Sequence, residues 1–457
     1  MPQSSSGKKL AKILAWLLIV SLFTGIALEA LFGPRLLWQS LTSNPTTHIN
    51  LYQSGIGVLA DGRVVELSPK KKVTYLPYSR VLTQDSDDTY VVLNAQDSSL
   101  PDADAWAAWL SGKTYPGQDT EFANLGLNAL LDLKALTLAS GPVLAAPSAK
   151  WRYIWPRDGA FAISAYAASG FLTEAHDSLT FFQKIQPKHG KFQARYLPDG
   201  SGTPDNRGTQ LDGTGWLLWA LGNYLDAVHA SEYSQHAAEL TQLLDTSTEA
   251  IISWLNEETG LPPVSSDYWE VKETKLTLGT AAPLLSGLQT SARIYEQLGQ
   301  KTKAQEVRKV ANRLAKGIEK GFKDNGYPRH LGESNVDAAV MFLLPPFTQT
   351  PLLGSKTAWE YSWEKMARPA GGIAPGSSWK QDGISWTPQT SLYALAAAYN
   401  GDEEKAREIL RWLQNHRTVN GSLPEKVLSN GAPAAVAPLS WTGSVVLLTL
   451  AKLTSEN

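Results

Sequence analysis

The sequence predicts an all-α fold, an α/α barrel of about twelve helices that spans residues 118–457. Two observations predict it. Apolar residues recur at i, i+3 and i+4 through this region, which is the spacing of one buried helix face. The connections alternate between short and long, and short connections join adjacent antiparallel helices. Such hairpins form an inner and an outer ring, with the long loops at one end. A helical solenoid is the alternative, but its hairpins resemble one another in sequence, and these do not.

The helical patterns lie at about 119–140, 158–169, 173–186, 211–229, 233–256, 277–298, 302–322, 335–345, 353–366, 386–399, 402–416 and 438–453. Short connections follow every second pattern, at 169–173, 230–232, 299–301 and 400–401. Long loops precede the alternate patterns, at about 141–157, 187–210, 257–276, 323–334, 367–385 and 417–437.

Residues 1–40 predict a membrane segment. An apolar run extends from about 13 to 32 and follows Lys8, Lys9 and Lys12. Roughly 20 apolar residues span a bilayer, and preceding basic residues place the N-terminus in the cytoplasm. We therefore expect a single-pass signal-anchor in the cell membrane, with the catalytic domain outside the cytoplasm. The alternatives are a cleaved signal peptide ending near Ala27, which gives a secreted protein, and a buried helix of a soluble fold.

Residues 41–117 predict a small β-rich region and a linker. The run 58–65 places an Asp-Gly pair between β-formers, which is a hairpin signal. The runs 73–76 and 90–93 are also typical of strands, and 98–117 reads as a linker with one short helix.

Composition excludes several classes of function. A formal net charge of −2 gives no electrostatic reason to expect a nucleic-acid partner. The absence of cysteine excludes disulfides, thiol chemistry and Cys-ligated metals. The histidines show no metal-ligand spacing, and neither a phosphate-binding loop nor a G-x-S-x-G motif is present. The sequence therefore gives no signal for any of these chemistries.

Acidic and aromatic residues cluster in the long loops, where sites are commonly built. The clusters are Trp155-Pro156-Arg157-Asp158, Gln210-Leu211-Asp212 with Trp216, Asp267-Tyr268-Trp269-Glu270, Asn335-Val336-Asp337, Leu423-Pro424-Glu425-Lys426 and Pro438-Leu439-Ser440-Trp441. Two carboxylates among aromatic rings and a guanidinium suit glycoside hydrolysis, in which one carboxyl protonates the leaving oxygen and another activates water.

Each acid also has a structural interpretation. Asp158, Asp212 and Asp337 stand where an N-cap belongs, and a cap satisfies free N–H groups of the following helix. Glu270 and Glu425 do not open a helix, so a solvated surface position is the alternative for them. Site and structural readings both remain open for these acids.

On these motifs, the region from about 119 onward resembles the glucoamylase family of glycoside hydrolases, which includes glucodextranases and some trehalases. The W-P-R-D run at 155–158 is similar to the family's sugar-binding loop, and 210–216 resembles the loop before its fourth helix. Trp269-Glu270 resembles the pair that carries the general acid, and the run 337–345 resembles the family's D-A-S-x-L-L-L-P stretch. The runs 423–426 and 438–441 resemble the segment that carries the general base.

The resemblance implies an (α/α)6 barrel and an inverting, exo-acting α-glucoside hydrolase without a cofactor. It implies that Glu270 is the general acid and Glu425 the general base. The substrate-binding residues it implies are Trp155, Arg157, Asp158, Asp212, Trp269 and Trp441. The partner is then a carbohydrate, an α-glucan or a short α-gluco-oligosaccharide.

This sequence departs from the family at two positions and in its N-terminal region. Val271 follows the acid where members often carry a second carboxylate, and Trp151 replaces a tyrosine of some members. The N-terminal β-sandwich of many bacterial members is also missing. Linkage preference therefore stays open. An inactive carbohydrate-binding sensor, a trehalase-like enzyme and a glycosyl-transferring enzyme remain alternatives.

Overall fold

The computed structural model describes residues 47–84 and 89–455. The membrane segment expected at about 13–32 lies outside the described residues. In the part of the chain that the structure describes, none of the helices has the length and hydropathy to cross a bilayer. Among the described residues, 48–380 and 384–455 form one compact unit, which contains the helices and strands given below.

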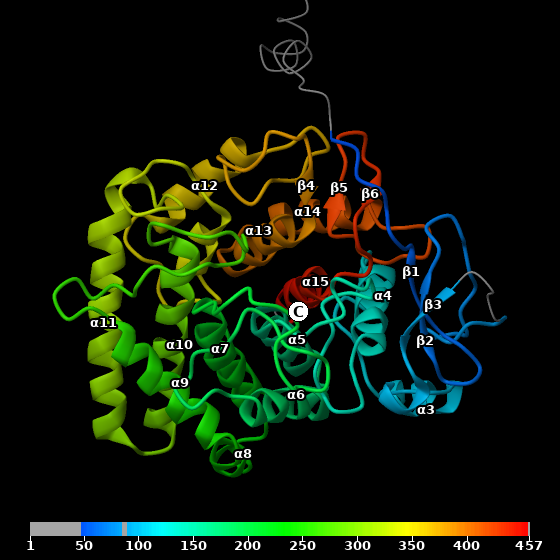
Figure 1. Cartoon of the computed structure of the whole chain (residues 1–457), viewed down its shortest axis with the longest axis horizontal. Helices are drawn as coiled ribbons and strands as arrows, with labels where there is room; N and C mark the ends of the chain where they lie inside the picture. Colours follow the sequence, from blue (N-terminus) through cyan, green and yellow to red (C-terminus); the bar gives the residue numbers. More distant parts are fainter. Residues whose placement is uncertain (1–46, 85–88, 456–457) are drawn as a thin grey trace, which may run out of the picture. The chain divides into compact units, whose positions relative to one another are not determined.

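The helices that follow the long loops form an inner ring. They are α5 (Pro156–Ala168), α7 (Asp212–Ala227), α10 (Leu278–Gln297), η3 (Ala338–Leu343), α13 (Thr387–Tyr399) and α15 (Ser440–Thr454). Each contacts the next in chain order, and α15 returns to contact α5, so the ring closes (Figure 1). These helices are apolar around most of their circumference because neighbours cover them on several sides. In α5, for example, every residue from Pro156 to Ala167 is buried.

The outer helices pack around this ring. They are α4 (Ala123–Ala135), α6 (Leu172–Lys184), α8 (Tyr233–Glu239), α9 (Thr241–Trp254), α11 (Lys301–Phe322), α12 (Ser355–Met366) and α14 (Glu403–Asn415). Several of them are amphipathic. In α14 the buried residues are Ala406, Ile409, Leu410 and Leu413, which is the i, i+3, i+4, i+7 spacing of one face. The predicted alternation of inner and outer helices is confirmed.

Two of the predicted helices differ from expectation. The pattern at about 335–345 is a 3-10 helix of six residues, because two successive prolines, Pro345 and Pro346, follow it and cannot continue a helical hydrogen-bond ladder. The pattern at about 233–256 is interrupted at Leu240, whose φ of −106° and ψ of 15° separate α8 from α9.

The region before the barrel contains a three-stranded antiparallel sheet, among the described residues, of β1 (Gly55–Val58), β2 (Val64–Leu67) and β3 (Thr89–Leu93). The hairpin predicted at 58–65 is confirmed, since Val58 pairs with Val64 around the Asp-Gly turn. The predicted strand at 73–76 is reduced to one bridge at Tyr75. The linker helix is α3 (Ala103–Leu110), and the short 3-10 turns η1 and η2 cover Ala95–Asp97 and Lys323–Asn325.

Arg80 joins this region to the barrel. Its Nε lies 2.6 Å from Oδ1 of Asp132 on α4, and both side chains are buried. A second small sheet lies at the loop end of the barrel, where β4 (Ser385–Trp386) pairs with β5 (Lys426–Val427) and β5 with β6 (Pro433–Ala434). This sheet holds two of the long loops together beside the inner helices.

Candidate active site

A cavity of about 580 Å³ lies at the loop end of the inner helices. Its walls come from the loops that precede α5, α7, α10, α13 and α15, as the predicted gathering of long loops requires. Seven of the predicted site residues line it together: Trp155, Arg157, Asp158, Trp269, Glu270, Glu425 and Trp441. Residues separated by up to 286 positions in the chain (155 to 441) therefore meet in one space.

The floor of the cavity is the first turn of α5. The helix begins at Pro156, so Arg157 and Asp158 project from its N-terminal end, and they are only 4% and 6% exposed. The capping interpretation of Asp158 is wrong, because the N-cap is Trp155 and Asp158 lies inside the helix. Burial raises the pKa of Asp158 to about 7, against the opposing effect of the Arg157 guanidinium.

Asp212 is behind the floor rather than on it. It is the first residue of α7, it is 1% exposed, and it is not among the residues that line the cavity. Its Oδ2 accepts a hydrogen bond of 2.9 Å from Nη1 of Arg157, which also donates to Gln210 at 3.1 Å. Burial raises the pKa of Asp212 to about 6, although Arg157 opposes this. Asp212 therefore orients Arg157 and does not reach the cavity itself.

Glu270 is held over this floor by an unusual backbone. Its φ is +56°, in the left-handed region that costs a non-glycine residue roughly 1–2 kcal/mol. Its N–H donates to the carbonyl of Asp267 at 2.8 Å, which closes the turn. Oε1 accepts from Nε1 of Trp155 at 2.5 Å and from Nη2 of Arg157 at 3.3 Å. Oε2 contacts Nη1 of Arg207.

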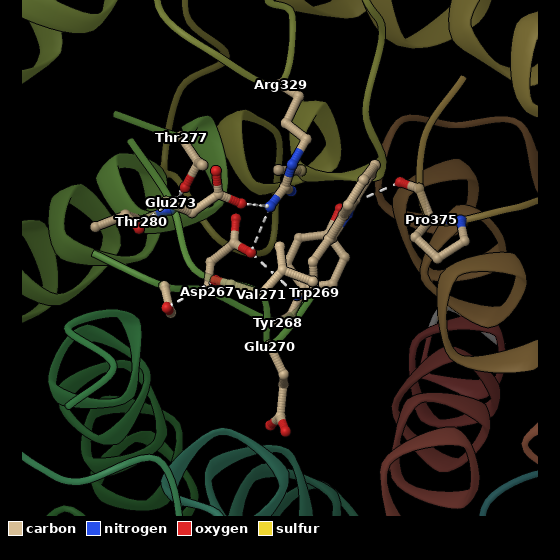
Figure 2. A network of polar contacts seen from close by, with 12 residues as sticks. Asp267, Tyr268, Trp269, Glu270, Val271, Glu273, Thr277, Thr280, Arg329 and Pro375 are labelled. Atoms are coloured by element: carbon tan, nitrogen blue, oxygen red, sulfur yellow. Dashed lines mark hydrogen bonds and ion pairs between the residues drawn. The ribbon is translucent and has the colours of Figure 1, made fainter. Parts of the chain in front are cut away.

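The turn that carries Glu270 is anchored by one buried guanidinium, that of Arg329. Its Nη2 lies 2.8 Å from Asp267 and 2.5 Å from Glu273, and its Nη1 lies 3.2 Å from Asp337. Figure 2 shows Arg329 with Asp267 and Glu273 on one side of the turn, and the Glu270 carboxylate pointing away from them. The guanidinium also lies over the Trp269 ring, 3.7 Å from its centroid. A single arginine thus fixes the loop from which Glu270 projects.

Asp337 has the structural role that its sequence position allowed. It is the N-cap of η3, and its side chain accepts from the N–H of Ala339 at 2.8 Å. The hydroxyl of Tyr268 donates to the same carboxylate. Burial raises the pKa of Asp337, with the Arg329 guanidinium opposing. The capping interpretation is confirmed, and Asp337 is not among the lining residues of the cavity.

Glu425 faces the cavity from the residue directly before β5. Its N–H donates to the carbonyl of Val436 at 2.8 Å, and its carbonyl accepts from the N–H of Thr387 at 3.0 Å. The side chain is 12% exposed, so a solvated surface position is excluded. Its Oε2 lies 3.2 Å from Nζ of Lys426, which itself lies 4.2 Å from the centroid of the Trp386 ring.

Indole rings form much of the remaining wall. Trp269 packs edge-on against Trp379 with ring centroids 4.7 Å apart, and Arg157 lies 5.3 Å from the centroid of the Trp441 ring. Within the described residues, the buried Nε1 groups of Trp269, Trp386 and Trp441 have no hydrogen-bond partner. Flat apolar faces with unused N–H donors suit a ligand that has C–H surfaces and hydroxyls, such as a sugar.

Four charged or amide-bearing lining residues lay outside the predicted clusters: Lys150, Arg195, Arg207 and Gln389. Arg195 and Arg207 lie in the same long loop. Their positive charge in one of the loops expected to form the site was the only sequence signal that could have identified them. Gln389 lies inside the α13 pattern, 2% exposed, and its Oε1 has no hydrogen-bond partner in the part of the chain that the structure describes. Nothing in the periodicity distinguishes it from a core residue.

Comparisons with known proteins find relatives of this chain. The profile described as Glycosyl hydrolases family 15 matches residues 123–366. An uncharacterized glycosyl hydrolase of Methanocaldococcus jannaschii is 21% identical over 372 residues, which cover 72% of this chain and 56% of that protein. A trehalase of Mycobacterium tuberculosis is 23% identical over 324 residues, which cover 59% and 46%. The chain thus spans about half the length of these curated relatives.

Solved structures share the fold. A wild-type glycosidase superposes with a TM-score of 0.62 at 19% identity, covering 73% of this chain and 98% of that one. A bacterial glucoamylase complexed with acarbose gives a TM-score of 0.61 at 18% identity, covering 76% and 57%. These likenesses confirm the predicted (α/α)6 barrel.

Proposed function

Because the chain belongs to glycosyl hydrolases family 15, we propose that it is an inverting, exo-acting α-glucoside hydrolase. It releases glucose from the non-reducing ends of α-glucans or short α-gluco-oligosaccharides. The observation that carries the proposal is the presence of Glu270 and Glu425 in one cavity above a buried, charged floor. A glucoamylase and a glycosidase with the same fold are complexed with acarbose and glucose, respectively, which supports a carbohydrate ligand.

In this mechanism the terminal glucose lies on the floor, where Arg157 and Asp158 hold its hydroxyls. Glu270 donates its proton to the glycosidic oxygen, and the bond from that oxygen to the anomeric carbon breaks. Glu425 accepts a proton from a water molecule, whose oxygen bonds to the anomeric carbon from the opposite face. The products are the free leaving group and β-glucose, and inversion predicts carboxyl groups about 6.5–9.5 Å apart.

Replacing either carboxylate tests the assignment. We expect Glu270→Gln and Glu425→Gln each to lower kcat by about 10²–10⁴-fold while sugar binding persists. Glu258→Gln is the matched control, since Glu258 is an exposed acid of the same long loop that does not line the cavity. NMR of the fresh product should show the β-anomer first. Full activity in either variant, or release of the α-anomer, contradicts the mechanism.

Trehalose is the second substrate to test, because several relatives are trehalases. A panel of maltose, isomaltose, trehalose, starch and dextran, with glucose release measured on each, decides the linkage. A rate that depends on added phosphate identifies a phosphorolytic enzyme instead. Binding without turnover on every member identifies a carbohydrate-binding sensor.

We also propose that the N-terminal segment anchors the protein in the cell membrane, with the barrel on the extracytoplasmic side. The support is the apolar run at about 13–32 behind three lysines. Fractionation of expressing cells, with protease added to intact spheroplasts, tests it. We expect full-length protein in the membrane fraction. Protease added outside intact spheroplasts should digest its barrel. Shortened protein in the medium indicates a cleaved signal peptide and secretion.

A further inference from the structure

The mouth of the cavity is more cationic than its floor. The lining residues that reach solvent there include Lys150 and Arg207, and Arg195 lies beside them with its guanidinium 4.9 Å from the centroid of the Trp155 ring. The carboxylates among the described lining residues are Asp158, Glu270 and Glu425, which belong to the floor or to the proposed reaction. Val271, directly after Glu270, is exposed and uncharged.

The contacts at the mouth do not neutralise its positive charge. Arg195 donates to the carbonyl of Lys150 at 2.9 Å and to Oδ2 of Asp205 at 2.5 Å. Nε of Arg207 lies 3.4 Å from the same Oδ2 of Asp205, and its Nη1 contacts Glu270. Two guanidinium groups therefore share one non-catalytic carboxylate. The ammonium group of Lys150 forms no ion pair within the described residues.

The proposed reaction removes a further negative partner. Oε1 of Glu270 is occupied by Trp155 and Arg157 from the floor, so Oε2 is the oxygen that faces the glycosidic bond. Arg207 now contacts Oε2 and has to leave it when a substrate binds. Arg207 and Lys150 are then left at the mouth with Asp205 shared between two arginines. Both side chains are exposed and within reach of an incoming anion, and guanidinium groups pair best with carboxylates and phosphates.

We infer that the preferred substrate is an α-glucoside whose leaving group carries an anionic group, a carboxylate or a phosphate. That group pairs with Arg207 and Lys150 at the mouth, and by drawing Arg207 away it frees Oε2 of Glu270 for the glycosidic oxygen. The inference rests on the proposed function and names its substrate class.

Paired substrates that differ in one charged group test this. Maltobionate and maltitol are both α-1,4-glucosides of an open-chain leaving group, and only the first carries a carboxylate. Trehalose 6-phosphate and trehalose differ by a phosphate. With the full-length enzyme, we expect kcat/KM to be about tenfold or more higher for the anionic member of at least one pair. The pair that responds distinguishes a carboxylate from a phosphate, and the ratio should fall as salt is added.

Arg207→Gln and Lys150→Gln should each move the ratio of kcat/KM within the responding pair toward one. Lys188→Gln is the matched control, because Lys188 is an exposed cation of the same long loop as Arg207 and does not line the cavity. It should leave the ratio unchanged. Equal kcat/KM for both members of both pairs, with clear hydrolysis, overturns this inference and leaves the proposed function standing.

Calorimetric binding separates the two proposals if no substrate is hydrolysed. That result overturns the proposed function. Tighter binding of maltobionate than maltitol, or of trehalose 6-phosphate than trehalose, lost in Arg207→Gln, then still supports an anion-selective mouth. Equal binding of the charged and neutral members overturns it.

Discussion

The two loops that carry Glu270 and Glu425 reach the same cavity but are held in different ways. The first loop is fixed through side chains, because Arg329 binds Asp267, Glu273 and Asp337, and none of these four residues is more than slightly exposed. The second loop is fixed through its backbone. The N–H and carbonyl of Glu425 are both hydrogen-bonded, and β5 next to it pairs with β4 and β6.

This difference affects how each loop responds to change. A backbone ladder keeps most of its hydrogen bonds when one side chain is replaced, whereas a buried ionic network loses its balance when one member is removed. Glu270 also has a left-handed backbone, and Glu425 does not. We therefore expect the loop of Glu270 to be more sensitive to single substitutions than the loop of Glu425.

The largest expected effect is that of Arg329→Met. It leaves buried carboxylates without a cation, so we expect unfolding free energy to fall by about 3–5 kcal/mol and kcat to fall with it as Glu270 loses its position. Arg80→Met is the matched control, because Arg80 pairs with buried Asp132 and neither residue lines the cavity. It should cost similar stability and keep kcat. Glu273→Gln supplies a milder variant, and full kcat in both it and Arg329→Met contradicts the expectation.

The next effect concerns Asp158, the buried acid on the floor of the cavity. The pKa of Asp158 is raised from 3.8 to about 7, so between these values the folded protein binds more protons than the unfolded chain. Stability therefore falls as pH rises from about 4 to about 7. Relative to wild type, Asp158→Asn should gain stability by about 2–4 kcal/mol over this range and no more above it. Urea titrations of both proteins at each pH measure this, and a pH-independent difference refutes it.

A smaller effect tests the loop that carries Glu425. The hydroxyl of Thr387 contacts the carbonyl of Glu425 at 3.2 Å and the hydroxyl of Thr442 at 2.9 Å. Thr387→Val removes these contacts and keeps the backbone N–H that also holds Glu425. We expect a loss of about 1 kcal/mol in unfolding free energy and a kcat within about twofold of wild type. A large fall in kcat shows that this loop, too, depends on side chains.

The smallest effect isolates the backbone conformation. Glu270→Gly and Glu270→Ala both delete the carboxylate, but only alanine is strained at a φ of +56°. The glycine variant should therefore be the more stable by about 1 kcal/mol. At position 425 the order should reverse by about 0.5–1 kcal/mol, because glycine loses more chain entropy there. Thermal unfolding of the four variants measures both differences. If glycine and alanine variants rank in the same order of stability at both positions, the two loops do not differ in backbone strain.

Helical periodicity predicted most of the fold because an amphipathic helix records its buried face locally. The pattern at 402–416 corresponds to α14 within a residue at each end. The α-helix predicted at about 335–345 was wrong, because the apolar residues with helical spacing there belong to a short buried 3-10 helix. Periodicity reports which residues are buried, and it does not report how many turns the neighbouring prolines allow.

The acids were harder to assign than the helices. Asp158, Asp212 and Asp337 have similar local sequences, and their roles separate only in space. Asp158 lies on the floor, Asp212 holds Arg157, and Asp337 caps η3 beside Arg329. An N-cap signature is the same in each case, because it depends on the helix that follows and not on what faces the carboxylate.

The sequence by itself determined the barrel and its alternating loops, because those features depend on local spacing and on residue type. It proposed the two glutamates through the resemblance of their motifs to those of the family. Only the tertiary structure decided which acids share a cavity, that Arg329 positions the loop of Glu270, and that Arg207 and Lys150 make the mouth cationic. These are contacts between residues from different loops. Their energies depend on distance and burial, which arise when the ring closes and are not encoded in any one segment.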